Sequence, residues 1–267
     1  MNITFKSIFS SITYVFIFLG CFFLMKNIPS LSPPVMLVIE YSSYVTFGVG
    51  IILSIRFNQG RVFLIILLLF LSQLFLNYYE KLSISTTAFS EVLYPLMCLL
   101  VPLNIVIISL LKERGIFSLW GKIRIALIVT QLIVVYMLTI SNHSSIQKVV
   151  NYKYIGSLFD NPIVNQTALV LFLFTLIFLI IKAVMKNSVF EARLVGVILS
   201  LFTALLFVQD KLSFSIFLSA TGLMLIIGVI EDSYSMAYVD ELTGIPSRRA
   251  LRENLMKLGN KYVIAMI

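Results

Sequence analysis

Charged residues are scarce in this sequence: Asp, Glu, Lys and Arg together make up 12% of its 267 residues. Hydrophobic residues make up 60%, and the mean hydropathy is +1.02. A soluble domain of this length needs many more polar residues to cover its surface. The composition therefore excludes an ordinary soluble protein and indicates an integral membrane protein.

Cysteine and histidine are also rare, and their positions exclude several kinds of site. Cys21 and Cys98 both lie inside apolar runs, where a thiol usually behaves as a small buried hydrophobic group. We therefore expect neither a disulfide nor a cysteine metal site. The single histidine, His143, lies in a segment predicted to be extracytoplasmic. This position argues against a histidine kinase, whose phosphoacceptor must be cytoplasmic.

The sequence does contain a series of long apolar runs. A membrane-spanning helix needs about 20 apolar residues, or about 17 at the short end. Runs of this kind lie at residues 8–25, 35–55, 62–79, 92–111, 123–141, 164–184, 189–208 and 213–230. The second run is a less certain span because it contains Glu40. The seventh is less certain because Glu191 and Arg193 lie near its start. We predict an all-α bundle of about eight transmembrane helices, which forms an input domain over residues 1–230.

The net charge of +8 is carried by the apolar part of the chain. Residues 1–230 hold 15 Lys and Arg against 7 Asp and Glu, whereas residues 231–267 hold 5 of each kind. If the N-terminus is cytoplasmic and all eight runs cross, ten of these basic residues lie on the inner side and five on the outer side. Basic residues concentrate in cytoplasmic loops, so we predict a cytoplasmic C-terminus. Membrane topology accounts for the charge, and we expect no nucleic-acid partner.

Polar side chains are costly in hydrocarbon, so those within the runs are candidates for function. Glu40, inside the second run, is the candidate intramembrane sensor residue. Amide side chains occur in or near other runs, at Gln73, Asn77, Asn104, Gln131, Asn165 and Gln166. The alternative interpretation, which we favour, is that Glu40 reaches the outer interface and the amides join helices by hydrogen bonds.

The sequence becomes polar at Glu231, after the last run. Apolar residues still recur at close to heptad spacing from Ile227 to Tyr238. This pattern predicts that the last helix continues into the cytoplasm as a linker over residues 231–240.

A turn, a helix and a strand are predicted after this linker. Gly244 and Pro246 indicate the turn, and Ser247 is suited to cap a helix over about 248–258. Residues 262–267 have the pattern of a buried strand. Because a single strand cannot bury itself, we expect residues 241–267 to be only the first part of an α/β domain.

The run Tyr238-Val239-Asp240-Glu241-Leu242-Thr243-Gly244-Ile245-Pro246-Ser247-Arg248-Arg249 resembles the start of GGDEF domains, the diguanylate cyclases of bacterial signalling. That start reads Asp-x-Leu-Thr-Gly-Leu-x-Asn-Arg-Arg. The residues that match are Asp240, Leu242, Thr243, Gly244, Arg248 and Arg249. The sequence departs from the pattern at Ile245, where Leu is usual, and at Ser247, where Asn is usual. The resemblance is confined to the last part of the chain.

The resemblance implies an enzyme that condenses two GTP molecules into cyclic di-GMP with Mg²⁺. It also implies a homodimer in the bacterial inner membrane. In this family the metal-binding Asp follows a strand like 262–267, and the Gly-Gly-Asp/Glu-Glu-Phe loop comes later. Residues 1–267 are therefore expected to lack the catalytic site and to be inactive alone.

The matching residues are expected to couple the last helix to the domain. Asp240 and Thr243 can bond to turn amides, and Asp240 could pair with Arg248 or Arg249 across the turn. We therefore predict that the motif forms a rigid joint, which passes motion from the membrane into the cyclase, and that it does not contact nucleotide.

Two other functions stay open on this sequence. The chain could be a multi-span transporter or membrane receptor with a vestigial tail, or its GGDEF domain could be degenerate and serve only as a binding module. A transporter should often show an inverted repeat or broken helices around charged residues at mid-membrane. No clear repeat is found and intramembrane charge is sparse, so we favour a membrane sensor that drives a diguanylate cyclase.

Overall fold

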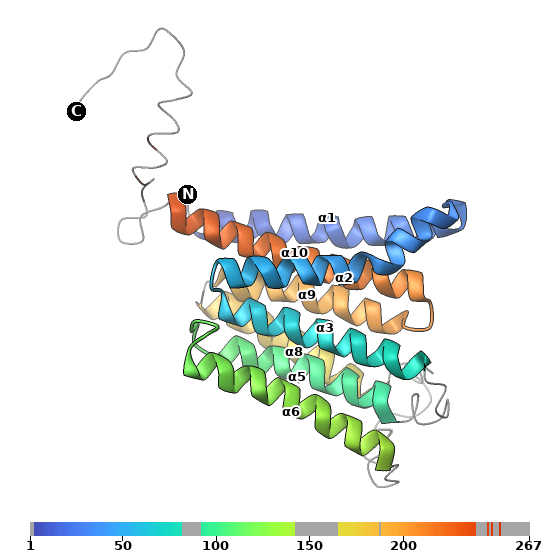
Figure 1. Cartoon of the computed structure of the whole chain (residues 1–267). Coiled ribbons are helices and arrows are strands. Elements are labelled where there is room, and N and C mark those ends of the chain that lie inside the picture. The colour runs from blue at the N-terminus through green and yellow to red at the C-terminus, as the bar shows by residue number, and fades with distance from the viewer. Residues whose placement is uncertain are drawn as a thin grey trace, which may run out of the picture.

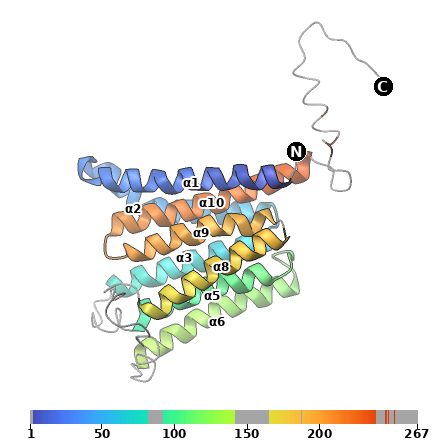
Figure 2. The ribbon, with the colours of Figure 1, turned by 180° about the vertical axis from the view of Figure 1, so that it is seen from behind.

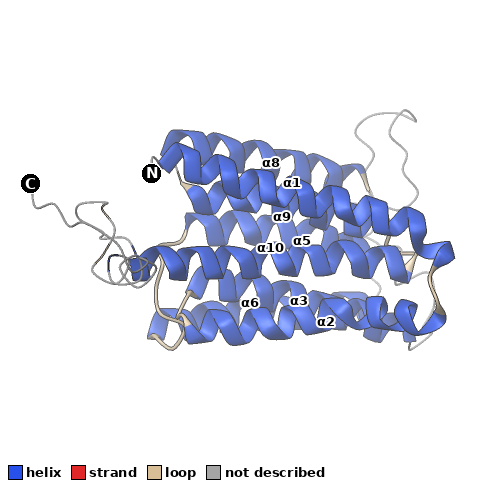
Figure 3. Ribbon diagram, turned by 90° about the horizontal axis from the view of Figure 1, so that it is seen from above, coloured by secondary structure: helices blue, strands red, loops and turns tan. Residues whose placement is uncertain are grey.

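The computed structural model describes residues 3–81, 92–141, 165–186 and 188–238, together with Ile245, Ser247 and Leu251. This part of the chain is helical and contains no strand. The helices have roughly aligned axes and lie side by side (Figures 1 to 3). Their bounds are α1 (Ile3–Asn27), η1 (Ile28–Ser30), α2 (Pro33–Arg56), α3 (Gly60–Lys81), α5 (Tyr94–Leu110), α6 (Leu119–Ser141), α8 (Gln166–Lys186), α9 (Val189–Leu206) and α10 (Lys211–Tyr238).

Each apolar run found in the sequence forms one of these α-helices, which confirms the predicted membrane bundle. Seven of the described helices are long and apolar enough to cross a membrane. α5 is also apolar but has only 17 residues, with Pro102 inside it. At 1.5 Å per residue it spans about 25 Å, slightly less than the hydrocarbon core of a bilayer. A full crossing by α5 therefore stays a prediction.

The outer surface of the bundle is apolar, which is the reverse of a soluble protein. Phe16 and Phe23 on α1 are 71% and 70% exposed, and Val38 on α2 is 71% exposed. Helices satisfy their backbone hydrogen bonds internally, so they can present such faces to lipid.

α10 is the central helix of the bundle. It packs most extensively on α2 and α9 and also contacts α1 and α3. In its most apolar stretch 78% of residues are buried, against 11% for the equivalent stretch at α1. Gly222 allows the close approach of α2, because a Cβ atom there would lie 2.8 Å from Thr46 Oγ1. The helix that leads to the C-terminal segment is therefore the most buried of the candidate spans, although Leu223 and Ile230 on one side of it are exposed.

Successive helices run in opposite directions, so the bundle has two ends (Figures 1 and 2). We call the end at which α10 finishes the tail end, and the opposite one the far end. α1, α3, α6 and α9 begin at the tail end, and α2, α5 and α8 finish there. The predicted orientation would place this end in the cytoplasm.

The last helix continues beyond the predicted span at 213–230 and ends at Tyr238, so the described part of the predicted linker over 231–240 is helical. Most of the predicted α/β segment, including the strand at 262–267, lies outside the described residues.

Candidate functional site

A buried arginine joins α9 to α10 at the tail end. Arg193 Nη2 lies 2.8 Å from Glu231 Oε2, and Nη1 lies 2.7 Å from Asp232 Oδ1. Nη1 also donates to the carbonyl oxygen of Gly228 at 3.2 Å. These three partners lie on one face of α10, because residues three and four apart on a helix are neighbours. The Arg193 side chain is only 6% exposed, so this contact, which we call the Arg193 clamp, is largely shielded from water.

A second ion pair joins α9 to α8 at the same end. Lys182 Nζ lies 2.7 Å from Glu191 Oε1, and both side chains are nearly fully buried. Ser188 Oγ donates to the other carboxylate oxygen of Glu191, and Lys182 also donates to the carbonyl oxygen of Ser109 on α5. The first turn of α9 is thus tied by charge to α8 on one side and to α10 on the other.

These pairs explain how α9 tolerates two charged residues near its start. An isolated charge in a low-dielectric environment is very costly, whereas a paired and hydrogen-bonded one is tolerated. The sequence marked this run as uncertain because of Glu191 and Arg193. Both residues are paired in the structure, and α9 keeps 18 residues of apolar helix.

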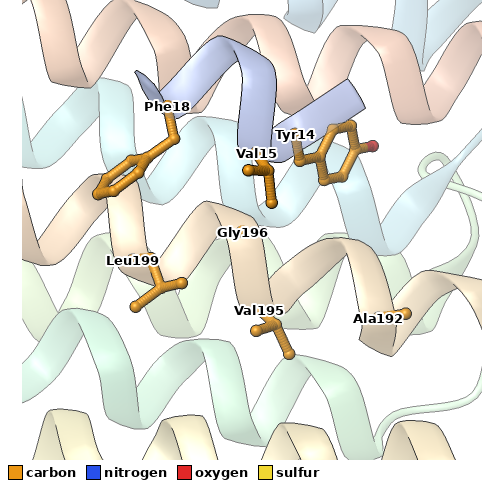
Figure 4. Close-up of a pocket in the computed structure, with 7 residues that line it drawn as sticks. All are labelled: Tyr14, Val15, Phe18, Ala192, Val195, Gly196 and Leu199. Carbon is orange, nitrogen blue, oxygen red and sulfur yellow. The ribbon is translucent and has the colours of Figure 1, made fainter. Parts of the chain in front are cut away.

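Tyr14 on α1 also reaches α10 close to the clamp. Its hydroxyl donates to the carbonyl oxygen of Met224 at 2.9 Å, and the side chain is 2% exposed. Between α1 and α9 lies an apolar crevice of about 120 Å³ (Figure 4), which is lined by Tyr14, Val15, Phe18, Ala192, Val195, Gly196 and Leu199. A Cβ atom at Gly196 would lie 3.1 Å from two Tyr14 carbon atoms. α1 and α9 therefore meet closely beside the clamp.

A groove of about 280 Å³ opens at the tail end beside α10, and its lining includes the apolar side chains of Val62, Phe190 and Met236. Gln59, Arg61, Glu113, Phe190, Asp232 and Ser235 lie along it. Gln59 donates to the carbonyl oxygen of Val229 at 3.2 Å, which ties the turn between α2 and α3 to α10 as well. The end of α10 is thus held by polar contacts from several directions.

Beyond α10 the chain folds back onto the end of this helix. The Ser247 amide donates to the Tyr238 carbonyl oxygen at 2.8 Å, and the Ser247 hydroxyl donates to that of Ala237 at 3.1 Å. These bonds satisfy carbonyl groups that the last turn of a helix leaves without partners. The Ser247 carbonyl accepts the amide of Leu251 at 3.0 Å, as in the first turn of the helix predicted to begin here.

The residues that carry the family resemblance, Asp240, Leu242, Thr243, Gly244, Arg248 and Arg249, all lie outside the described residues. Between Asp240 and Arg249 the structure describes only Ile245 and Ser247, the two positions at which the sequence departs from the family pattern. The predicted role of the six residues as a structural joint stays a prediction.

Glu40 lies far from the Arg193 clamp, in the half of α2 that is nearer to the far end. It is partly buried, and its backbone carbonyl oxygen accepts a hydrogen bond from Ser215 Oγ of α10 at 3.1 Å. Its carboxylate forms no ion pair with any residue that the structure describes. A sensor role for Glu40 stays a prediction, and its backbone links it to the central helix.

Two of the amide residues join α3 to α2 in the same half of the bundle. Gln73 Nε2 donates to Ser43 Oγ at 2.6 Å, and Asn77 Nδ2 donates to the Tyr44 hydroxyl. The prediction that amides link helices is confirmed for this pair. Asn104 instead donates to the carbonyl oxygen of Leu100 in its own helix.

Among the described residues, no group of three His, Cys, Asp or Glu side chains could hold a metal ion. The chemistry that the site does offer is electrostatic: charges on α8, α9 and α10 meet where the central helix leaves the bundle. In the sequence, Lys182 and Arg193 contribute to the predicted orientation, and Arg193 also makes the seventh run a weaker candidate for a span. The signal that could have indicated the pairs is that Glu191, Glu231 and Asp232, of opposite charge, fall at helix ends on the same predicted side of the membrane.

Comparison of the chain with models of protein families, with curated proteins and with solved structures gives no match in any of the three.

Proposed function

We propose that this chain is the membrane input region of a diguanylate cyclase, and that the bundle controls cyclic di-GMP synthesis through α10. The observation that carries the proposal is the run from Asp240 to Arg249, which follows the last membrane helix directly. In the proposed protein a catalytic GGDEF domain uses two GTP molecules with Mg²⁺. That domain would supply the metal ligands and would act as a homodimer.

The position of α10 supports a coupling role. It is the most buried of the candidate spans and the last helix before the motif. A signal that repacks α1, α2 or α9 must change contacts with α10, because packed helices are not continuously deformable. The Arg193 clamp lies near the point where α10 leaves the bundle, so its charges would set the position of the joint.

Production of cyclic di-GMP by the natural protein tests this proposal. The coding sequence beyond Ile267 should encode an Asp directly after the strand and a Gly-Gly-Asp/Glu-Glu-Phe loop further on. The purified full-length protein in lipid nanodiscs should convert GTP to cyclic di-GMP with Mg²⁺, detected by liquid chromatography and mass spectrometry. The absence of those residues or of product would refute the enzymatic proposal.

The coupling part of the proposal has a separate readout. Arg193→Gln should change kcat for cyclic di-GMP formation while leaving KM for GTP close to the wild-type value, because the residue lies in the membrane bundle and not at the nucleotide site. Arg56→Gln is the matched control, since Arg56 is exposed at the same end and forms no ion pair with a described residue. Equal rates in wild type and both variants would refute control through the clamp. If the protein instead bound cyclic di-GMP without making it, the degenerate binding module would replace the enzyme.

A further inference from the structure

The turn between α5 and α6 carries an unusual concentration of positive charge. Within residues 112–124, which we call the basic turn, lie Lys112, Arg114, Lys122 and Arg124. None of these four forms an ion pair with a residue that the structure describes. The one acidic residue of the turn, Glu113, is already engaged: its Oε2 lies 2.6 Å from Arg61 Nε, and its Oε1 accepts the Arg61 amide at 3.1 Å. The turn therefore presents four cations without a counter-ion among the described residues, and one of them, Arg124, also donates from Nη1 to the Lys112 carbonyl oxygen at 3.2 Å.

The basic turn is held in place by the neighbouring turn between α2 and α3. The Ile116 amide donates to Asn58 Oδ1 at 3.0 Å, and the Ile116 side chain is buried. Asn58 adopts a left-handed backbone conformation (φ 52°), which asparagine tolerates better than most residues. Gly60 lies so close to the turn that a Cβ atom there would be 2.2 Å from the Arg114 carbonyl oxygen. The four cations are thus displayed on a fixed scaffold, which lowers the entropy lost when they bind a ligand.

Exposed apolar side chains lie among these charges, at the end of the turn and the start of α6. Phe117, Leu119 and Trp120 are 70%, 72% and 53% exposed. The Arg114 guanidinium lies over the Trp120 ring, 4.9 Å from its centre. Tryptophan beside basic residues is typical of the level of lipid headgroups. Beyond it, the open side of α6 continues with exposed Ile123 and Leu127, because α6 packs chiefly on α3.

We infer that the basic turn and the start of α6 bind an anionic phospholipid, with the headgroup phosphate among the four cations and the acyl chains along the open side of α6. Charge complementarity selects this occupant, because a zwitterionic headgroup would leave the positive charge uncompensated. The exposed apolar side chains of Phe117, Leu119 and Trp120 call for a ligand that carries hydrocarbon chains, as a lipid does. The inference depends on the membrane bundle alone and stands apart from the proposed cyclase activity.

Trp120 provides a local probe, because it is the only tryptophan in the chain. The protein is reconstituted in bilayers that mix phosphatidylcholine with phosphatidylglycerol, and the acyl chains of one lipid at a time are brominated. Bromine quenches the Trp120 fluorescence only on contact, so the two titrations give the relative binding constant of the anionic lipid at this surface. For the wild type we expect a preference on the order of tenfold for phosphatidylglycerol, which weakens at high salt.

The variants separate specific binding from general attraction to a charged membrane. Lys112→Gln combined with Lys122→Gln should reduce the preference from about tenfold to about twofold or less, since each basic residue near an anionic surface contributes up to about fivefold. Both side chains are exposed, so the protein should fold normally. Lys186→Gln, which removes an exposed lysine from α8 at the same end, should leave the preference unchanged. Two outcomes would overturn the inference. One is equal binding constants of the two lipids for the wild type. The other is a loss of preference in the Lys186→Gln protein as large as that in the double variant.

Discussion

Replacing Arg193 by glutamine should loosen the central helix at the tail end. The substitution removes the Arg193 charge from beside the carboxylates of Glu231 and Asp232 in a confined site. Breaking a fully buried ion pair costs about 3–5 kcal/mol. The two carboxylates are 24% and 35% exposed, so they recover part of their hydration and the cost falls to about 2–3 kcal/mol. This corresponds to a melting temperature lower by roughly 5–10 °C.

The two natural cysteines report this change from different parts of the bundle. Both thiols are buried in the folded protein, so a thiol-reactive fluorescent dye labels them only as the bundle opens. Cys21 lies on α1, with its Sγ 4.0 Å from the Ile216 carbonyl oxygen of α10, whereas Cys98 lies on α5. In proteins that keep one cysteine each, Arg193→Gln should lower the labelling temperature of Cys21 more than that of Cys98.

A charge-neutral variant tests whether electrostatics is the cause. Arg193→Met combined with Glu231→Gln and Asp232→Asn removes all three charges together, so no carboxylate is left unpaired. Its melting temperature should return to within about 3 °C of the wild-type value. Arg56→Gln, on the exposed end of α2, should melt like the wild type. The reasoning fails if Arg193→Gln melts like the wild type, or if the neutral variant is no more stable than the single one.

Three further predictions concern packing and hydrogen bonds elsewhere in the bundle. Gly60→Ala should lower the free energy of unfolding by about 1–3 kcal/mol, because the added methyl group pushes the Arg114 carbonyl away. Gly48→Ala should be neutral, because a Cβ atom there meets no atom within 4 Å. Thiol-labelling melts compare the two proteins, and equal melting temperatures would contradict the close approach at Gly60. Gln73→Leu should lower the free energy of unfolding by about 0.6–1.7 kcal/mol, because its hydrogen bond to α2 is lost. Glu40→Gln should leave the melting temperature from thiol labelling unchanged. A destabilised Glu40→Gln protein would show that the Glu40 carboxylate has a partner. Ser247→Ala should speed hydrogen exchange of the residue 247 amide about threefold to tenfold, because it removes one hydrogen bond to the end of α10. Ser235→Ala is the control, and mass spectrometry measures the exchange. Unchanged exchange would argue against a chain that folds back onto the end of α10.

Much of the fold could be predicted because a bilayer imposes a simple rule on sequence. Each spanning segment must be helical and apolar over most of its length, so the eight runs could be located without any tertiary information. The ends were less certain. The first helix begins at Ile3, earlier than the apolar run at 8–25, and α6 begins at Leu119, earlier than the run at 123–141. Helix ends depend on local contacts that hydropathy does not record.

The candidate site could be predicted only in part. The motif from Asp240 to Arg249 is legible because its residues are contiguous in sequence. The Arg193 clamp is not, because Arg193 and Asp232 are 39 residues apart and many pairings of charged helix ends fit the same sequence. The scarcity of charge made each such residue notable, but it did not indicate which ones meet.

The sequence by itself determined three properties: that the chain is a membrane protein, which segments form its helices, and at which residue the polar segment starts. These properties follow from the cost of placing polar groups in hydrocarbon. Only the tertiary structure decided that α10 lies at the centre and that Arg193 forms ion pairs with it. The structure also decided that the basic turn packs against Asn58 and Gly60. Lipid-facing and helix-facing residues are equally apolar, so hydropathy cannot rank helices by burial. Packing of side chains from distant segments makes that choice, and it places the charges where the central helix leaves the bundle.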